Sequence, residues 1–316
     1  MRAAILALGL AVLAPLPALG ADCKLVQSAA LPLSRTPDGW VVVPVEVGGT
    51  HARFTLNTGS VVSFVTPQAA ALTAFHTEAI ENVYASGNPL HQAAILSMFT
   101  LGGLVGTNQR FVLLSNGGST TGGTDGEIGL DKLEGYDVEL DLGHDKMNLF
   151  RQDHCPGQAV YWTDSAAVIP FQIQPDGQIN LPMELDGKPV NVILDTTQST
   201  SEIGVAAVHR LFGLARNELT AVPADGGPGD YRGAFHTLSV GGLAISNPDI
   251  AIFDYGDSEA ICDGKFHVPP RSRHYPVPYR CYGGGDMRIG LKQLRALRMF
   301  ISFSEKTLYV TPAGAH

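Results

Sequence analysis

The sequence lacks the features that would assign it to several common classes of protein. Its 316 residues include 21 lysines and arginines against 30 aspartates and glutamates. An acidic chain without a long basic run does not favour nucleic acid as a partner. Beyond the N-terminus, no run reaches the roughly 20 apolar residues that a membrane-spanning helix needs. The composition therefore excludes a polytopic membrane protein, and we expect no nucleic-acid partner.

Metal and redox motifs are also missing. There are four cysteines without a CxxC pair, and the ten histidines are scattered without an HExxH sequence. Structural zinc sites and zinc peptidases depend on such spacings, so we expect no metal and no cofactor. A GxSxG sequence is absent as well, which disfavours an α/β-hydrolase with a serine nucleophile.

The first 20 residues are typical of an export signal. A positive start at Arg2 precedes a largely apolar stretch over 3–19, and small residues at Ala18 and Gly20 suit cleavage after Gly20. The sequence predicts a signal peptide over 1–20 and a mature protein in the periplasm or outside the cell, without a membrane anchor. The alternative is an uncleaved anchor, which two prolines within the stretch disfavour.

Two blocks of sequence occur twice, in the same order. Residues 40–65 align with 178–203 at an offset of 138, which pairs Asn57 with Asp195. Each copy has two apolar strands around a glycine-containing turn, followed by a short polar loop. Residues 125–150 align with 286–311 at an offset of 161, and each copy has an Ile-Gly-Leu step and a hairpin.

The double repeat predicts two similar lobes. With 36 glycines and 20 prolines, the chain has the turn residues that many short strands require. We expect an all-β protein with lobes over 21–160 and 161–316; the alternative is two unrelated β units with similar turns. In an exported protein four cysteines suggest two disulfides. Pairing within each lobe gives Cys23–Cys155 and Cys262–Cys281.

The repeated loops resemble the Asp-Thr-Gly loops of aspartic proteases. One strand ends Phe-Thr-Leu-Asn-Thr-Gly-Ser and its counterpart ends Val-Ile-Leu-Asp-Thr-Thr-Gln. The Ile-Gly-Leu steps at 128–130 and 289–291 resemble the apolar–apolar–Gly motif of that family, which packs beside the catalytic loop. The chain is most similar to bacterial retropepsin-like proteases, with two lobes in one chain as in pepsin. The resemblance implies an all-β bilobal fold with a pseudo-two-fold axis and a central cleft.

The resemblance also assigns the site residues. It places Asp195 and Asn57 at the two catalytic positions, where the loops of the two lobes meet. The supporting loop residues are Thr58, Gly59, Ser60, Thr196 and Thr197. A flap is expected around 83–90, with Tyr84, Ser86 and Gly87 near its tip. The basic stretch 263–280 is either an insertion bordering the cleft or a decorated surface loop.

Two departures from the family pattern indicate impaired catalysis. Aspartic proteases need two carboxylates that share one proton, and the amide of Asn57 cannot take up and return a proton near neutral pH. Thr197 stands where the first loop has Gly59, and its branched side chain is expected to loosen the contact between the loops. The sequence thus predicts an exported, monomeric pseudoprotease that binds an extended peptide or protein segment in its cleft. The alternatives are a weak aspartic endopeptidase using Asp195 and a structural relic of the fold.

Overall fold

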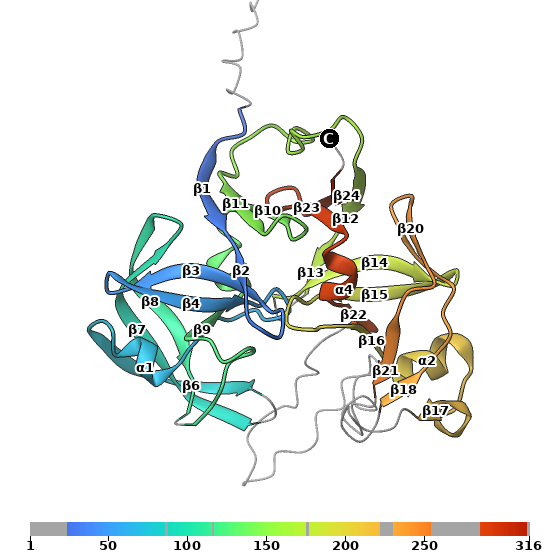
Figure 1. The fold of residues 1–316 in the computed structure, drawn as a ribbon, viewed down its shortest axis with the longest axis horizontal. Helices are drawn as coiled ribbons and strands as arrows, with labels where there is room; N and C mark the ends of the chain where they lie inside the picture. Colours follow the sequence, from blue (N-terminus) through green and yellow to red (C-terminus); the bar gives the residue numbers. More distant parts are fainter. Residues whose placement is uncertain are drawn as a thin grey trace, which may run out of the picture.

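The protein forms two β lobes that are joined by a shared sheet (Figure 1). The computed structural model describes residues 24–85, 88–115, 117–174, 177–221, 230–253 and 285–314. The expected signal peptide and the basic stretch 263–280 lie outside these residues, as do three of the four cysteines. The export signal and the disulfide pairing therefore stay predictions.

The first lobe contains a single large sheet. Its elements are β2 (Ser34–Arg35), β3 (Val41–Val47), β4 (Thr50–Leu56), β5 (Phe64–Val65), α1 (Pro67–Ala70), β6 (Phe75–Ala85), β7 (Asn88–Leu101), β8 (Leu104–Leu113), β9 (Gly126–Ile128) and the short turn η1 (Leu130–Lys132). The strands follow the order β2-β3-β4-β9-β5-β8-β7-β6, and β3 also pairs with β7. This second pairing curls the sheet toward a barrel, so that its apolar side chains face inward.

The second lobe is built around an equivalent set of strands. Its elements are β13 (Gln172–Ile173), β14 (Ile179–Leu185), β15 (Lys188–Leu194), β16 (Ser201–Gly204), α2 (Val205–Phe212), η2 (Arg216–Glu218), β17 (Thr220–Ala221), β18 (Asp230–Arg232), β19 (Thr237–Val240), β20 (Leu243–Ser246), β21 (Ile250–Phe253), β22 (Met287–Ile289) and α4 (Leu291–Leu294). The main path runs β17-β18-β21-β16-β22-β15-β14-β19-β20, and β13 pairs with β14.

A third sheet takes strands from both halves of the chain. The first half supplies β1 (Gln27–Pro32), β10 (Asp137–Asp141) and β11 (Lys146–Phe150), and the second supplies β12 (Ala167–Pro170), β23 (Leu297–Ser302) and β24 (Thr307–Pro312). Their order is β1-β11-β10-β23-β24-β12, so that β10 and β23 meet at the centre. This shared sheet lies above the two lobes in Figure 1.

The repeat seen in the sequence is a repeat of strands. At the offset of the first block β3 and β4 recur as β14 and β15, and at the offset of the second block β9 recurs as β22, each with the same bounds. The hairpin turns correspond too: Gly48 and Gly49 have positive φ angles of 60° and 81°, and Asp186 and Gly187 have 48° and 73°. Two consecutive positive φ angles are typical of the tight turns that suit β-hairpins.

The lobes differ between these repeated blocks. The first lobe continues into the long strands β6, β7 and β8, whereas the second continues through α2 and the short strands β17 to β21. The chain between the two blocks is longer in the second copy, which is why the offset grows from 138 to 161. The predicted all-β bilobal fold is confirmed, while the boundary at residue 160 stays a prediction.

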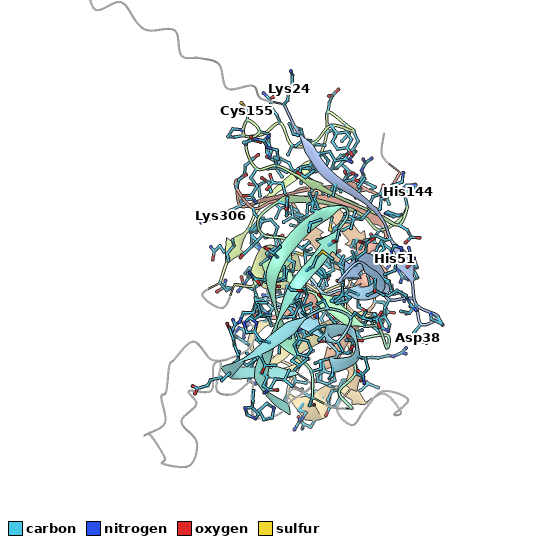
Figure 2. The ribbon with its side chains drawn as sticks, turned by 90° about the vertical axis from the view of Figure 1, so that its left-hand side faces the viewer. Lys24, Asp38, His51, His144, Cys155 and Lys306 are labelled. Carbon is cyan, nitrogen blue, oxygen red and sulfur yellow. The ribbon has the colours of Figure 1, made fainter. Side chains whose placement is uncertain are left out.

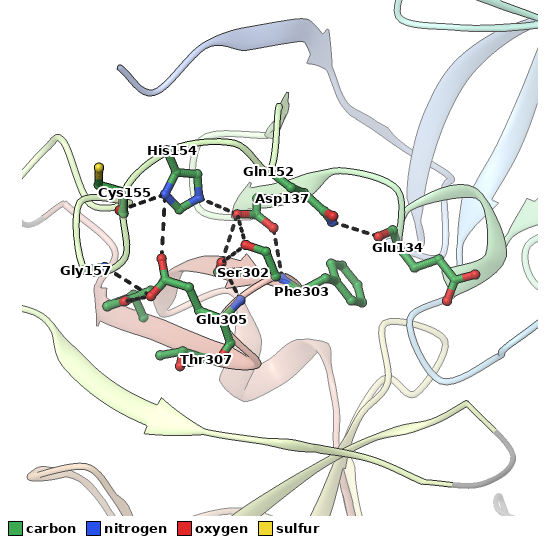
Figure 3. Close-up of polar contacts among 12 residues, drawn as sticks. Glu134, Asp137, Gln152, His154, Cys155, Gly157, Ser302, Phe303, Glu305 and Thr307 are labelled. Atoms are coloured by element: carbon green, nitrogen blue, oxygen red, sulfur yellow. Dashed lines mark hydrogen bonds and ion pairs between the residues drawn. The ribbon is translucent and has the colours of Figure 1, made fainter. Parts of the chain in front are cut away.

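Buried polar contacts link the two halves on the shared sheet (Figure 3). Asp137 of β10 is fully buried, and its Oδ2 lies 2.5 Å from Nε2 of His154. Ser302 donates a hydrogen bond to the same carboxylate over 2.8 Å, and the main-chain NH of Phe303 donates over 2.9 Å. Because both residues of the second half bond to Asp137, this carboxylate fastens β23 to β10.

The His154 imidazole favours its charged form. Burial acts to lower the pKa of His154. The hydrogen bonds to Asp137 and to the Cys155 carbonyl, together with the charges of Asp137 and Glu305, outweigh that effect and raise the pKa overall.

Figure 2 places Cys155 at the same end of the molecule as Lys24, the first described residue. Among the described residues, no helix is long and apolar enough to cross a membrane.

Candidate active site

Two threonines join the loops of the two lobes. The main-chain NH of Thr58 donates to Oγ1 of Thr196, and the NH of Thr196 donates to Oγ1 of Thr58, both over 3.1 Å. Each hydroxyl then donates to a carbonyl of the opposite lobe, Thr58 to Leu194 over 2.9 Å and Thr196 to Leu56 over 2.5 Å. This reciprocal arrangement fixes the two loops against each other around the pseudo-two-fold axis.

The Ile-Gly-Leu block of each lobe is hydrogen-bonded to the loop that carries Asn57 or Asp195. The NH of Asn57 donates to the Ile128 carbonyl over 2.8 Å, and the NH of Asp195 donates to Ile289 over 3.1 Å. Glycine is required at the centre of each block, because a Cβ on Gly129 would lie 2.4 Å from a main-chain oxygen. The blocks thus present Asn57 and Asp195 in equivalent backbone settings.

Serine side chains complete this support in both lobes. Ser63 accepts a hydrogen bond from the Gly129 NH over 2.8 Å, and Ser201 accepts one from Gly290 over 2.9 Å. The pairing of Ser63 with Ser201 in the sequence repeat therefore corresponds to a shared structural role. Ser60 does not support the Ile-Gly-Leu block with its side chain, because its hydroxyl donates to the Val62 carbonyl within its own loop.

Thr197 connects the two catalytic positions. Its hydroxyl lies 2.6 Å from Oδ1 of Asp195 and 3.4 Å from Oδ1 of Asn57. Its NH also donates to Oδ1 of Asp195, over 2.9 Å. The structure thus brings Asn57 and Asp195 together, although they lie far apart in the chain. The expected loosening by Thr197 is not observed among these contacts, because its side chain turns its hydroxyl toward the two polar groups.

Gly59 has no room for a side chain. A Cβ at this position would lie 2.4 Å from the carboxylate of Asp195, closer than any ordinary contact. Its carbonyl accepts a hydrogen bond from Nε2 of Gln178 over 3.0 Å. The glycine of the first loop therefore allows the side chain of Asp195 to approach it closely.

Two charged residues complete the polar surroundings, and the sequence analysis did not identify them. Glu127 of β9 accepts a hydrogen bond from Nδ2 of Asn57 over 2.6 Å, and Arg288 of β22 donates one to Oδ2 of Asp195 over 2.7 Å. Asn57 is 9% exposed and Asp195 is 3% exposed. At the centre of the site, the Asn57 amide therefore donates to the Glu127 carboxylate. Beside it, the Asp195 carboxylate accepts from the Arg288 guanidinium.

The described part of the candidate flap packs in an apolar cluster. Strands β6 and β7 form an antiparallel hairpin whose register pairs Val83 with Leu90. Both residues belong to an apolar cluster that also includes Val62 of the Asn57 loop. Tyr84 lies in β6 opposite Pro89, while Ser86 and Gly87 fall outside the described residues. A hairpin therefore exists at the expected place, and its role as a flap stays a prediction.

Comparison with known proteins bears on the fold alone. No family model and no curated protein matches the sequence. Among solved structures, basic 7S globulin from soybean is similar over 93% of this chain and 98% of its own, with a TM-score of 0.53 and 10% identity. That neighbour has a pepsin-like bilobal fold. This chain has the same fold.

Within the pepsin-like fold, Glu127 and Arg288 stand at matching places. Each is the residue before the isoleucine of its Ile-Gly-Leu block, at the offset of 161 that relates the blocks. The sequence itself contains this signal, because one charged residue directly precedes each otherwise apolar Ile-Gly-Leu sequence. Its meaning depends on where each side chain points, which the strand pattern alone does not give.

Among the described residues, no group of three or more His, Cys, Asp or Glu side chains could hold a metal ion.

Proposed function

We propose that the protein is a non-proteolytic member of the pepsin-like fold that binds extended peptide segments. One observation carries the first half of this proposal: Asp195 faces an amide, and its own oxygens are occupied. Thr197 bonds to Oδ1 and Arg288 bonds to Oδ2. Hydrolysis on this fold needs one carboxylate to take a proton from water while its partner donates one to the substrate carbonyl. Asn57 can do neither.

Peptide binding is supported by the edge of the first lobe. Strand β6 lies at the end of its sheet, and among the described strands its partner is β7. Residues 75–79 of this edge are exposed. An exposed strand edge offers main-chain donors and acceptors to an added strand, and such binding requires no catalytic carboxylates. We propose that an extended peptide pairs with β6.

The proposal is tested with purified mature protein and one peptide in two forms. The first form is an extended apolar peptide, and the second has the same side chains with alternate amides N-methylated. We expect the unmodified peptide to bind without being cleaved at acid pH, and the methylated peptide to bind at least about tenfold more weakly. Robust cleavage that Asp195→Ala abolishes would replace the proposal with an active protease. If neither form of the peptide bound, the remaining interpretation would be that the protein is a structural relic of the fold.

Export and a monomeric state are part of the same proposal. They rest on the apolar N-terminal stretch over 3–19 and on the two lobes that one chain supplies. Edman sequencing of the protein from culture fractions is expected to begin at Ala21. Light scattering of that material is expected to give the mass of one chain, and a dimer would refute the monomer.

A further inference from the structure

We infer that Glu127 and Arg288 are paired positioning residues that hold Asn57 and Asp195 in a non-catalytic arrangement. This inference rests on the proposed function, and it adds a second cause of inactivity to the loss of one aspartate. It predicts that restoring an aspartate at position 57 does not by itself restore a working pair of carboxylates.

Both residues occupy the same place in their lobes. Glu127 lies in register between Thr55 of β4 and Phe64 of β5. Arg288 lies between Ile193 of β15 and Glu202 of β16, which are the same positions of the second repeat. In both lobes the side chain at the centre of this three-strand unit contacts the residue at the catalytic position, Asn57 or Asp195.

The contact of Glu127 fixes the Asn57 amide. Oε2 of Glu127 accepts from Nδ2 of Asn57 over 2.6 Å, and Oε1 accepts from the Thr121 NH over 2.7 Å. Glu127 is 8% exposed, so both of its oxygens depend on these protein donors. An aspartate at position 57 would replace the donor with an acceptor and bring two carboxylates into contact.

The contact of Arg288 fixes Asp195. Its Nη1 donates to Oδ2 of Asp195 over 2.7 Å, while Thr197 donates to Oδ1. Glu202 lies 4.0 Å from Nε on the other side of the guanidinium. The pair is mostly buried, with 24% of the Arg288 side chain and 4% of the Asp195 side chain exposed. The two-carboxylate chemistry requires a proton shared between two acids, whereas here both oxygens of Asp195 already accept hydrogen bonds from Thr197 and Arg288.

The two contacts suggest a stepwise reconstruction. Asn57→Asp with Glu127→Gln exchanges the amide and the carboxylate, so that the hydrogen bond between the two residues is kept with its direction reversed. Arg288→Met then removes the charge while it keeps much of the side-chain volume, and it restores an apolar residue before Ile289. Arg210→Met is the matched control, since Arg210 is exposed and pairs with Asp286, which lies close to Arg288 in the chain.

The proteolytic test compares five variants at pH 3 to 7 on a denatured protein substrate. We expect no cleavage by Asn57→Asp, by the Asn57→Asp/Glu127→Gln double variant, or by that double variant carrying Arg210→Met. We expect cleavage with a bell-shaped pH profile when Arg288→Met joins the double variant, and its loss on Asp195→Asn. Full activity of Asn57→Asp alone would overturn the inference, as would a folded Asn57→Asp/Glu127→Gln/Arg288→Met variant that is no more active than the double variant.

A second measurement applies if the triple variant does not fold. It uses Arg288→Met and Arg210→Met alone, in the presence of a peptide that contains a statine residue. This peptide probes Asp195 and not the edge of β6, because the statine hydroxyl would hydrogen-bond to Oδ2 of Asp195, the oxygen that Arg288 occupies. We expect Arg288→Met to bind this peptide at least about tenfold more tightly than the original protein does, and Arg210→Met to bind it equally well. Equal binding by all three would overturn the inference. Cleavage by the unsubstituted protein would instead count against the proposed function. In that case the ratio of the statine-peptide affinities of Arg288→Met and Arg210→Met would still decide the role of Arg288.

Discussion

Thr58 and Thr196 donate their main-chain NH groups to each other's hydroxyls across the junction of the lobes, both over 3.1 Å. Both residues are buried, at 3% and 1% exposure. Because each hydroxyl also donates to a carbonyl of the opposite lobe, removing one side-chain oxygen leaves both a buried NH and a buried carbonyl without a partner.

We therefore expect Thr58→Val and Thr196→Val each to lower the free energy of unfolding by about 1–3 kcal/mol, because valine has the shape of threonine without its hydroxyl. The double variant is expected to lose less than the sum of the two, since both changes remove one network. Urea unfolding measures all three. Thr77→Val on the exposed face of β6 is the control and is expected to have a small effect. Strictly additive losses would show that the two threonines act independently.

Gly59→Ala is expected to destabilise the protein by about 1–3 kcal/mol, because the new Cβ would overlap the carboxylate of Asp195. Gly135→Ala is the matched control, since a Cβ on Gly135 meets no atom within 4 Å. Thermal unfolding of the two variants compares them directly. Equal midpoints would mean that the Asp195 loop moves aside without cost.

Asn57→Asp alone is expected to lower stability at neutral pH by about 1–3 kcal/mol, because it places a carboxylate against Glu127 in a buried setting. The loss should shrink at acid pH, where one of the two acids takes up a proton. Asn148→Asp is a useful comparison, since Asn148 donates to Glu139 over 2.9 Å in the same way. There Arg298 also contacts Glu139 over 2.6 Å, so we expect a smaller loss. An Asn57→Asp variant as stable as the original protein at pH 7 would contradict this account.

The buried pair of His154 and Asp137 predicts a loss of stability at alkaline pH. The pKa of His154 is raised in the folded protein above its ordinary value of 6.5. A raised pKa means that the folded state holds the proton more tightly, so the contribution is complete below about pH 6.5. It disappears as the pH rises through the raised value. Urea midpoints measured between pH 5.5 and 9 are expected to fall over this interval.

His154→Gln is expected to be less stable at low pH and to show a flatter pH dependence over the same interval. His144→Gln is the matched control, because His144 also contacts an aspartate, Asp141, over 2.9 Å, but half of its side chain is exposed. That variant is expected to keep the pH dependence of the original protein. If the slope survives His154→Gln, another group is responsible for it.

The sequence predicts much of the framework because repeated local patterns specify it. The alternating strands, the turn at Gly48 and Gly49 and the glycine of each Ile-Gly-Leu block leave the backbone few alternatives. The catalytic positions follow from the same repeat. The part that the sequence analysis missed depends on side-chain direction. Thr197 was expected to crowd the axis by its volume, whereas the direction of its hydroxyl decides its contacts.

Glu127 and Arg288 illustrate the same limit. A charged residue within a short strand usually indicates a solvent-facing side chain. Here each strand lies between two others, and the charged side chain contacts a polar residue of the loop, Glu127 contacting Asn57 and Arg288 contacting Asp195. Aligning the second repeat block identifies positions 127 and 288 as equivalent. Only the packing of the loops against the strands identifies their partners.

The pairing of β10 with β23 also makes each half of the chain complete the sheet of the other. The pair of Val138 with Ile301 and the pair of Leu140 with Met299 exchange places under the offset of the second repeat block, so the two strands meet with near-equivalent edges. Either half alone would expose that strand edge, and in the whole chain each half covers the edge of the other. Joining two copies in one chain makes their association independent of concentration. It also lets the two loop positions carry different residues, as Asn57 and Asp195 do.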